Sequence, residues 1–419
     1  MFMIGFLFFV FGFISWLNAI LIPYFRLALQ LSINEAMMVT FSFYISYFVM
    51  AFPSSRILRI TGFKKGMMYG LFIMASGAFI FIPAAIFKSY PLFLTGLFVQ
   101  ATGLTLLQTA ANPYVTILGP IESAAKRMSI MGICNKIAGA IAPLVLLKIV
   151  TKNPQEIDRV SKILPSLLPD KAQAILNELI HRLIVPYAML GIVLILLGVL
   201  IRYSGLPDIK EEKATGSPSG EIKFPYLLLG AFAIFCGVSA EVLAVDTIIS
   251  FAEYKGFPFI TAKYFATITL IAMILAYLIG AFAIPLYISQ RRALLYSSAA
   301  GILLTFGLMI TPNKWAIWEL VLIGFCNALL WPSIWPLALK GLGSDTKRAS
   351  AFLVMGIVGG AITPLLFGYI AGRSGMQSAY IVLFPLYAFL LYYGSAGYLS
   401  VQRKLALVRN TKAKTPLMI

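Results

Sequence analysis

Apolar stretches long enough to cross a lipid bilayer recur from one end of this chain to the other. A stretch of about 20 apolar residues fits an α-helix across the hydrocarbon core, and a helix satisfies its own backbone hydrogen bonds there. With 60% hydrophobic and 11% charged residues in 419, the composition excludes a soluble domain. Twelve such stretches occur, at roughly 4–26, 37–60, 66–87, 90–118, 126–150, 184–204, 223–252, 260–287, 291–312, 314–342, 347–372 and 377–402. The sequence therefore predicts an all-α membrane protein with twelve transmembrane helices.

One segment of the chain occurs twice. LLQTAANPYVTILGP (Leu106–Pro120) returns in outline as LLWPSIWPLALKGLG (Leu329–Gly343), and each copy leads into a basic pair and a Gly/Ala-Pro run. Parallel repeats of this kind, with a binding site between them, are typical of transporters. The repeat predicts two pseudo-symmetric six-helix bundles, with a bundle at 1–204, a cytoplasmic linker at 205–222, a second bundle at 223–402 and a basic cytoplasmic tail at 403–419.

The net charge of +18 is explained by membrane topology. Most Lys and Arg residues fall in the segments on one side of the predicted helices, and the positive-inside rule then places both termini in the cytoplasm. This distribution indicates lipid headgroup contact and no nucleic-acid partner. On the other side, the polar segment Pro154–Arg182 leaves the membrane, and IDRVSKILPSLLP within it is expected to form a short interfacial helix.

Nothing in the sequence indicates an enzyme, a cofactor or a metal site. Cys134, Cys236 and Cys326 lie inside predicted spans with a spacing that matches no metal or redox motif, and the one histidine, His181, lies in an outer loop. We expect a small-molecule transporter that is a monomer.

Polar side chains inside the predicted spans mark candidate binding positions, because a polar group in hydrocarbon is costly and tends to face the bundle interior. Amides match the vicinal hydroxyls of a sugar, and an indole face stacks on the C–H face of a pyranose. The alternatives are interhelical hydrogen bonding for the amides and ordinary packing for Trp331 and Trp335. Pro113 is expected to open the helix backbone here. The candidate substrate-binding residues are Asn18, Gln108, Asn112, Asn135, Asn327 and Trp331.

Among the charged residues inside predicted spans, Lys136, Glu241 and Asp246 stand out. An unpaired charge at the bilayer centre costs at least roughly 2.5–3.5 kcal/mol. One interpretation is a structural ion pair between Lys136 and Glu241 across the two halves. The other is that an acid of the seventh helix binds a driving cation while Lys136 competes for it. Both roles, cation coupling and gating, remain open at this stage.

Six segments of the chain carry a resemblance to a known family. The most specific is QTAANPYVTILGP, and the supporting segments are GFISWLNAILIPYF, NKIAGAIAP, AEVLAVDTI, WPSIWPLALKGLG and MGIVGGAITP. They resemble the sugar branch of the major facilitator superfamily that contains the fucose–proton symporters and the bacterial glucose/galactose transporters. Such a resemblance implies twelve helices, alternating access and hexose uptake across the inner membrane of a bacterium.

Two departures from this resemblance bear on coupling. The fucose–proton symporters carry acids at the positions of Ala19 and Gln108, and both are neutral here. Glu241 fits the glucose/galactose subgroup better, so coupling is expected through the seventh helix. We predict a secondary active transporter that imports a hexose with sodium or a proton. The alternatives are a passive hexose facilitator, favoured by the lost acids, and a receptor or drug exporter on the same fold, which the amide-rich cavity disfavours.

Overall fold

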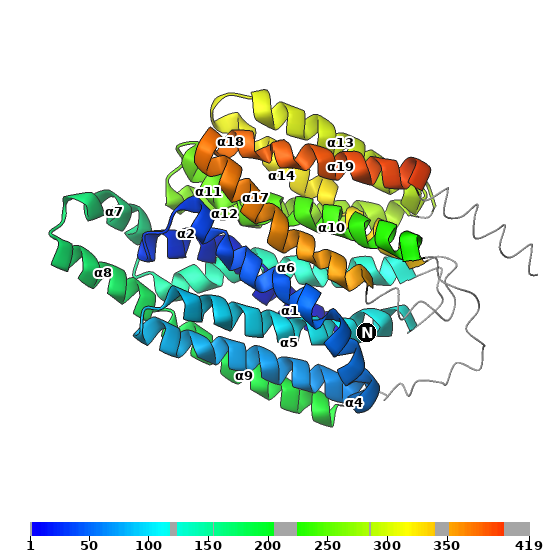
Figure 1. The fold of residues 1–419 in the computed structure, drawn as a ribbon, viewed down its shortest axis with the longest axis horizontal. Helices are drawn as coiled ribbons and strands as arrows, with labels where there is room; N and C mark the ends of the chain where they lie inside the picture. Colours follow the sequence, from blue (N-terminus) through cyan, green and yellow to red (C-terminus); the bar gives the residue numbers. More distant parts are fainter. Residues whose placement is uncertain are drawn as a thin grey trace, which may run out of the picture.

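The protein folds entirely into helices over the residues that the structure describes. The computed structural model describes residues 2–117, 124–153, 155–204, 224–284, 286–339 and 352–397. Long helices run side by side along the longest axis of the molecule, with α7 and α8 at one end and the amino terminus near the other (Figure 1). We call these ends the α7/α8 end and the N-terminal end. The predicted linker at 205–222 and tail at 403–419 lie outside the described residues.

The first half of the chain forms one set of helices. Its elements are α1 (Phe2–Ser15), α2 (Asn18–Ala28), α3 (Ile33–Ala36), α4 (Met38–Ile86), α5 (Tyr90–Ile117), α6 (Ala124–Val150), α7 (Glu156–Ile163), η2 (Leu164–Ser166), α8 (Pro169–His181) and α9 (Ile184–Tyr203). The helix α5 runs through Pro113 without interruption, so the prediction that this proline opens the backbone is wrong. A helix tolerates the missing N–H at one position when packing on both sides holds it in place.

The second half forms a second set of helices. Its elements are α10 (Phe224–Asp246), α11 (Ile248–Tyr254), α12 (Phe259–Ala283), α13 (Gln290–Ile310), η3 (Asn313–Trp315), α14 (Ala316–Asn327), α15 (Leu330–Leu339), η5 (Gly356–Val358), α17 (Gly359–Ser374), α18 (Met376–Ala379), η6 (Tyr380–Val382), α19 (Leu383–Tyr392) and η7 (Tyr393–Gly397). In this second copy of the repeat the helix is interrupted between α14 and α15, upstream of Pro332 and Pro336.

The longest element, α4, contains two membrane crossings. Its 49 residues would extend about 74 Å, more than twice the thickness of the hydrocarbon core. Gly62 divides it with φ 76° and ψ 169°, a conformation that is open to glycine and to almost no other residue. The described residues contain eleven helices long and apolar enough to span a membrane, and one of these holds both crossings of α4. The count is therefore consistent with the twelve predicted helices.

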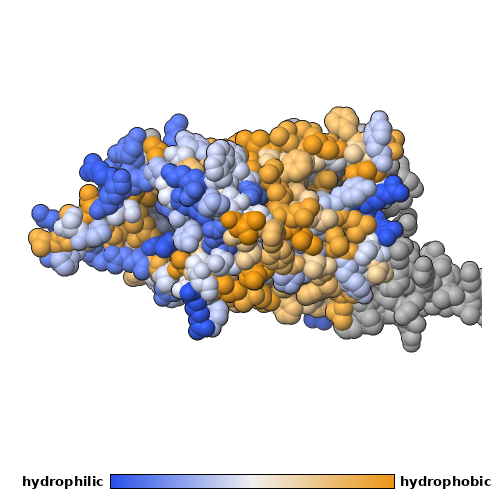
Figure 2. All heavy atoms as spheres, turned by 90° about the horizontal axis from the view of Figure 1, so that it is seen from above, coloured by the Kyte–Doolittle hydropathy of each residue, from blue (hydrophilic) through white to orange (hydrophobic). Residues whose placement is uncertain are grey.

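The surface of the molecule matches a membrane environment. A broad hydrophobic region covers its middle, whereas hydrophilic residues gather toward the α7/α8 end (Figure 2). On α9, Met189, Ile192 and Leu196 are exposed, as expected for side chains that face lipid. The opposite face of the same helix is buried through Gly191, Leu194 and Gly198.

The helix predicted in IDRVSKILPSLLP is present as α7, and a second helix, α8, follows it. α7 and α8 form a hairpin at one end of the molecule (Figure 1). Arg182 joins them, because its guanidinium binds Glu156 of α7 at 2.8 Å and Glu178 of α8 at 2.9 Å. Hydrogen bonds from Lys152 and Arg182 lower the pKa of the Glu178 carboxyl to about 2. The hairpin is therefore anchored to the end of α6, where Lys152 lies.

The two halves are in contact at the α7/α8 end. Helix α2 packs against α10 and α11, and α3 packs against α17. The second contact is close: a Cβ atom placed on Gly368 would lie 2.9 Å from the Met37 side chain. Nearly every residue of α2 is buried. This end of the molecule is therefore closed.

Candidate functional site

A buried ion pair joins the two halves in the interior of the molecule. The ammonium group of Lys136 on α6 pairs with the carboxylate of Glu241 on α10. Only 4% of the Lys136 side chain and 13% of the Glu241 side chain are exposed. An isolated charge in this position would be costly, so each group stabilises the ionised form of the other. The Lys136–Glu241 ion pair, one of the two interpretations of the sequence, is therefore present in the structure.

Trp16 organises the environment of Lys136. It lies in the break between α1 and α2, where the backbone forms the tighter hydrogen bond from Leu17 N to Ile14 O. Its indole N–H donates to the side-chain oxygen of Asn135 at 3.0 Å. The Lys136 ammonium lies 3.9 Å from the centre of the indole ring, within range of a cation–π interaction. One tryptophan therefore fixes two neighbouring residues of α6.

Two glycines allow the first helical span to approach α6 this closely. A Cβ atom on Gly12 would lie 1.9 Å from the carbonyl oxygen of Asn135, and one on Gly139 would lie 2.2 Å from the Trp16 ring. Neither distance is possible for a real side chain. Small residues at such contacts let helix backbones pack tightly in a membrane. The position of the indole is therefore built into the packing of α1 against α6.

Asp246 is a second buried acid, with different surroundings. It is the last residue of α10, directly before the interruption that separates α10 from α11, and only 1% of it is exposed. The Thr40 hydroxyl donates to one carboxylate oxygen at 3.5 Å, a long hydrogen bond. The other oxygen has no hydrogen-bond partner among the described residues. Lys136 and Glu241 both act on Asp246 electrostatically, although no ion pair with it is present in the described part of the chain.

The predicted amides divide into those with and those without partners. Gln108 donates to the Tyr47 hydroxyl at 3.1 Å, and Asn327 accepts from the Tyr387 hydroxyl at 2.6 Å. Asn18 is fully buried, and neither atom of its amide has a partner among the described residues. Asn112 lies on α5, but its side chain falls outside the part of the structure that is described.

The two tryptophans of the repeated segment lie against each other. The rings of Trp331 and Trp335 stack with centroids 5.1 Å apart and planes 26° apart. Trp331 also lines a crevice with Glu241 and with residues of α10 and α15. This crevice is too narrow for a water molecule. The structure therefore brings Trp331 to the ion pair, but it holds no space for a sugar there in this conformation.

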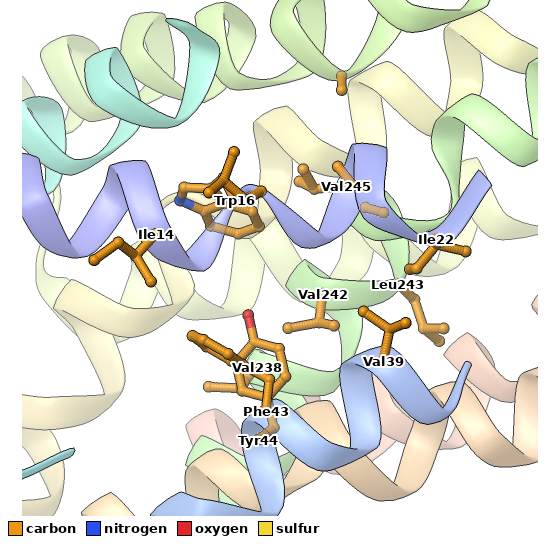
Figure 3. Close-up of a cluster of buried hydrophobic side chains, with 14 of the residues drawn as sticks. Ile14, Trp16, Ile22, Val39, Phe43, Tyr44, Val238, Val242, Leu243 and Val245 are labelled. Carbon is orange, nitrogen blue, oxygen red and sulfur yellow. The ribbon is translucent and has the colours of Figure 1, made fainter. Parts of the chain in front are cut away.

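Apolar side chains close the interior around this site. Figure 3 shows Trp16 and Ile22 from the first span above Val39 and Phe43 of α4, with side chains of α10 between and beside them. Phe43 is fully buried, as are Val39 and Ile22. The labelled members of the cluster are Ile14, Trp16, Ile22, Val39, Phe43, Tyr44, Val238, Val242, Leu243 and Val245.

Sequence reasoning missed the contribution of α4. Thr40, Tyr44 and Tyr47 follow one another at intervals of four and three residues, so they share one face of the helix. Tyr44 stacks on Tyr47 with ring centroids 6.0 Å apart, and Thr40 reaches Asp246. Their hydroxyls occur in the otherwise apolar run VTFSFYISYF and did not stand out as charged groups do. The helical spacing was the available signal.

A buried ion pair therefore lies where two sets of membrane-spanning helices meet, and the chain belongs to the Major Facilitator Superfamily. The sequence pattern of that family matches residues 4–357. The family consists of transporters and not of enzymes, and this chain is a multi-pass membrane protein.

Several relatives cover nearly the whole chain. The chain is similar to a glucose/galactose transporter of Brucella abortus, with 33% identity over 93% of this chain and 92% of the relative. It is also similar to the L-fucose-proton symporter of Escherichia coli, with 30% identity over 88% and 86%.

Solved structures support the same fold. The chain matches the E. coli fucose:proton symporter FucP, which is also known in an outward conformation, with TM-score 0.73 and 26% identity over 94% of this chain and 97% of that chain. A bacterial homologue of the lysosomal transporter Spinster, in an inward-facing conformation, matches with TM-score 0.60 and 14% identity over 97% of both chains. This second likeness concerns the fold alone.

Proposed function

We propose that this protein imports a hexose together with a cation, sodium or a proton, across the inner membrane of a bacterium by alternating access. The observation that carries the proposal is the buried Lys136–Glu241 ion pair between the halves, with an indole on one side and amides nearby. The names of the relatives, a glucose/galactose transporter and a fucose-proton symporter, support a hexose as the substrate class. With both termini cytoplasmic, the α7/α8 end faces outward.

The sugar would bind where amides and indoles converge. Asn135 and Gln108 already hold partners that a sugar hydroxyl could replace, since Trp16 and Tyr47 are themselves able to bond a sugar. The buried Asn18 amide has free donors and acceptors within the described structure. Trp331 would supply a stacking face beside Glu241. Asn112 remains a proposed contact on the strength of its sequence position. Asn327 is a proposed contact of the same kind, because its side-chain oxygen accepts from Tyr387 and its amide nitrogen has no partner among the described residues.

The cation would bind at the acids of α10. Glu241 has a cationic partner in Lys136, whereas Asp246 has none among the described residues. A cation or proton on Asp246 would neutralise its carboxylate, which in the ionised form acts electrostatically on the same lysine. Binding and release at Asp246 would thereby change how strongly Lys136 holds the two halves together, which couples ion movement to gating.

Counterflow of labelled sugars in proteoliposomes tests the substrate class. Vesicles loaded with one unlabelled hexose at a time should take up the labelled form of that hexose transiently against its gradient. We expect glucose, galactose or fucose to give this overshoot and a non-sugar solute such as an amino acid to give none. Absence of counterflow with every hexose, in protein that is monodisperse after purification, would contradict the proposal.

A passive hexose facilitator is the second candidate function. It is supported by the neutral residues Ala19 and Gln108 and by the Lys136–Glu241 pair, which could serve as a fixed structural bridge. In that case the Glu241→Gln variant would exchange sugar without any dependence on ions, as the unmodified protein would. An ion-dependent exchange in the unmodified protein that the variant loses would exclude the facilitator.

A further inference from the structure

The amino-terminal end of α12 is capped by a residue from the other half of the protein. The Asp158 carboxylate on α7 accepts a hydrogen bond from the backbone N–H of Phe259 at 2.6 Å and another from Ile260 at 2.8 Å. These are the first two residues of α12. The contact therefore joins the α7/α8 hairpin of the first half to a transmembrane helix of the second.

Helix α12 does not cap itself. The residue before it is Pro258, whose side chain forms no hydrogen bond with the backbone of the first turn. By contrast, α13 begins at its own cap, where the Ser289 hydroxyl accepts from Arg292 N. The first N–H groups of any helix need acceptors from elsewhere, and a carboxylate also complements the positive end of the helix dipole. Asp158 supplies both.

The hairpin that carries Asp158 is firmly attached to the first half. The Tyr24 hydroxyl on α2 donates to the backbone carbonyl oxygen of Leu179 on α8 at 2.7 Å. Glu156 accepts from the Lys152 N–H at 2.6 Å and pairs with Arg182 at 2.8 Å. Because of these contacts Asp158 moves with the first half and not with α12. Separation of the halves at this end must therefore break both hydrogen bonds of Asp158.

We propose that Asp158 is a latch that holds the α7/α8 end of the transporter closed by capping α12 across the two halves. The latch goes beyond the proposed function, because it requires only that the halves separate at this end and does not depend on the sugar or the ion. When this end opens, the two backbone N–H groups and the carboxylate return to water. The closed conformation is therefore favoured by the difference in free energy between these groups in the charged cap and the same groups in water.

The size of the effect follows from helix capping. Replacement of a capping side chain by alanine commonly costs enough to change an equilibrium by about 5–30-fold. The Asp158→Ala variant should raise the population that is open at the α7/α8 end by about this factor. Asp158→Asn keeps an oxygen acceptor without the charge, so its open population should lie between those of the unmodified protein and Asp158→Ala. Asp170→Ala removes an exposed acid of the same hairpin whose side chain has no hydrogen bond or ion pair within the described structure, and it should leave the population unchanged.

Labelling of a buried position measures the open population. Val39 is fully buried on α4 in the closed interior, so Val39→Cys should react with a membrane-impermeant maleimide only when this end opens. The three native cysteines are first replaced by alanine, and right-side-out and inverted vesicles are labelled in parallel. We expect about 5–30-fold faster labelling with Asp158→Ala from the side of the α7/α8 end. Equal rates for Asp158→Ala and Asp170→Ala would overturn the latch.

A covalent cross-link tests the same contact by a second route. Asp158→Cys removes the cap but, joined to Ile260→Cys by a short bifunctional maleimide or by oxidation, it should fix the end closed and stop transport. The disulfide form should recover on reduction, whereas cysteines at 170 and 260 should not cross-link. Transport at the full rate in protein cross-linked between 158 and 260 would also overturn the proposal, because the two halves would then not separate there.

Discussion

Removal of one partner of the Lys136–Glu241 pair should destabilise the protein far more than removal of both. Each single variant, Lys136→Met or Glu241→Gln, leaves the other residue without its charged partner. That residue then lies in a site from which water is largely excluded. The double variant Lys136→Met with Glu241→Leu leaves no charge there. The comparison therefore separates the loss of one partner from the loss of both charges.

The expected magnitudes follow from burial. Breaking a buried pair by removing one partner costs about 3–5 kcal/mol, whereas replacing both partners with apolar residues of similar volume is about neutral or stabilising. The Trp16 ring, 3.9 Å from the ammonium, remains in contact with Lys136 in the Glu241→Gln variant. It cannot replace a carboxylate, because a cation–π interaction contributes only about 0.5–2 kcal/mol. We therefore expect each single variant to lose about 3 kcal/mol or more and the double variant to recover most of this.

Thermal unfolding of purified protein in detergent is the assay, with the three variants measured side by side. Lys263→Met is the control, since Lys263 is also buried but contacts a tyrosine ring at 5.2 Å and no carboxylate in the described structure. The loss of stability in Lys263→Met should be smaller than that in Lys136→Met. A double variant less stable than both single variants would refute the reasoning, because the ion pair would then contribute stability that apolar packing does not replace.

Three further perturbations have defined outcomes. Trp16→Phe keeps an aromatic ring but removes the indole N–H that donates to Asn135. The free energy of unfolding should therefore fall by about 1 kcal/mol, measured by thermal stability. Gly62→Ala forces a side chain into a glycine-only conformation and should cost about 1–3 kcal/mol in the same assay, whereas Lys65→Ala, at an exposed position three residues further on, should cost less. Burial raises the pKa of Glu253 to about 7, with Arg26 opposing the rise and Asp158 adding to it. Opening of this end would solvate Glu253 and return its pKa toward 4.5. Protonated Glu253 therefore favours the closed conformation fully below pH 4.5, and this contribution is lost as the pH rises toward 7. The reactive thiolate of any cysteine also increases with pH, so each labelling rate is divided by the rate of an exposed control cysteine at the same pH. This ratio should be higher at pH 8 than at pH 5, and a pH-independent ratio would contradict the assignment.

The fold could be predicted from the sequence because its signals are local and repeated. Long apolar runs define the spans, and the second copy of the Leu106–Pro120 segment indicates two halves. The turn inside α4 carries a signal as well, a glycine followed by two lysines in TGFKK. What the sequence did not predict is backbone response: α5 continues through Pro113, whereas the matching helix is interrupted before Leu330. In both copies the helix runs through the matching proline, Pro113 or Pro336, so the proline alone does not predict where the backbone is interrupted.

The candidate site could be predicted only as far as charges and amides reveal it. Lys136 and Glu241 stand out in hydrocarbon, and their pairing was one of two interpretations. The roles of Tyr47 and Thr40 depend on helices that are distant in sequence, so their polar contacts emerge only from the packing of α4 against α5 and α10. The cap on α12 was hidden for the same reason, because Asp158 lies about a hundred residues from its partners along the chain.

Gradient-driven sugar uptake in proteoliposomes tests the central claim most directly. Sodium and pH gradients are imposed separately, and the unmodified protein is compared with Asp246→Asn, which keeps the size of the side chain but cannot hold a cation or exchange a proton. The account predicts that one of the two gradients drives accumulation in the unmodified protein. It also predicts that Asp246→Asn still performs sugar counterflow but no longer accumulates sugar. Equal uptake by the unmodified protein with and without both gradients would contradict the account and identify a passive facilitator.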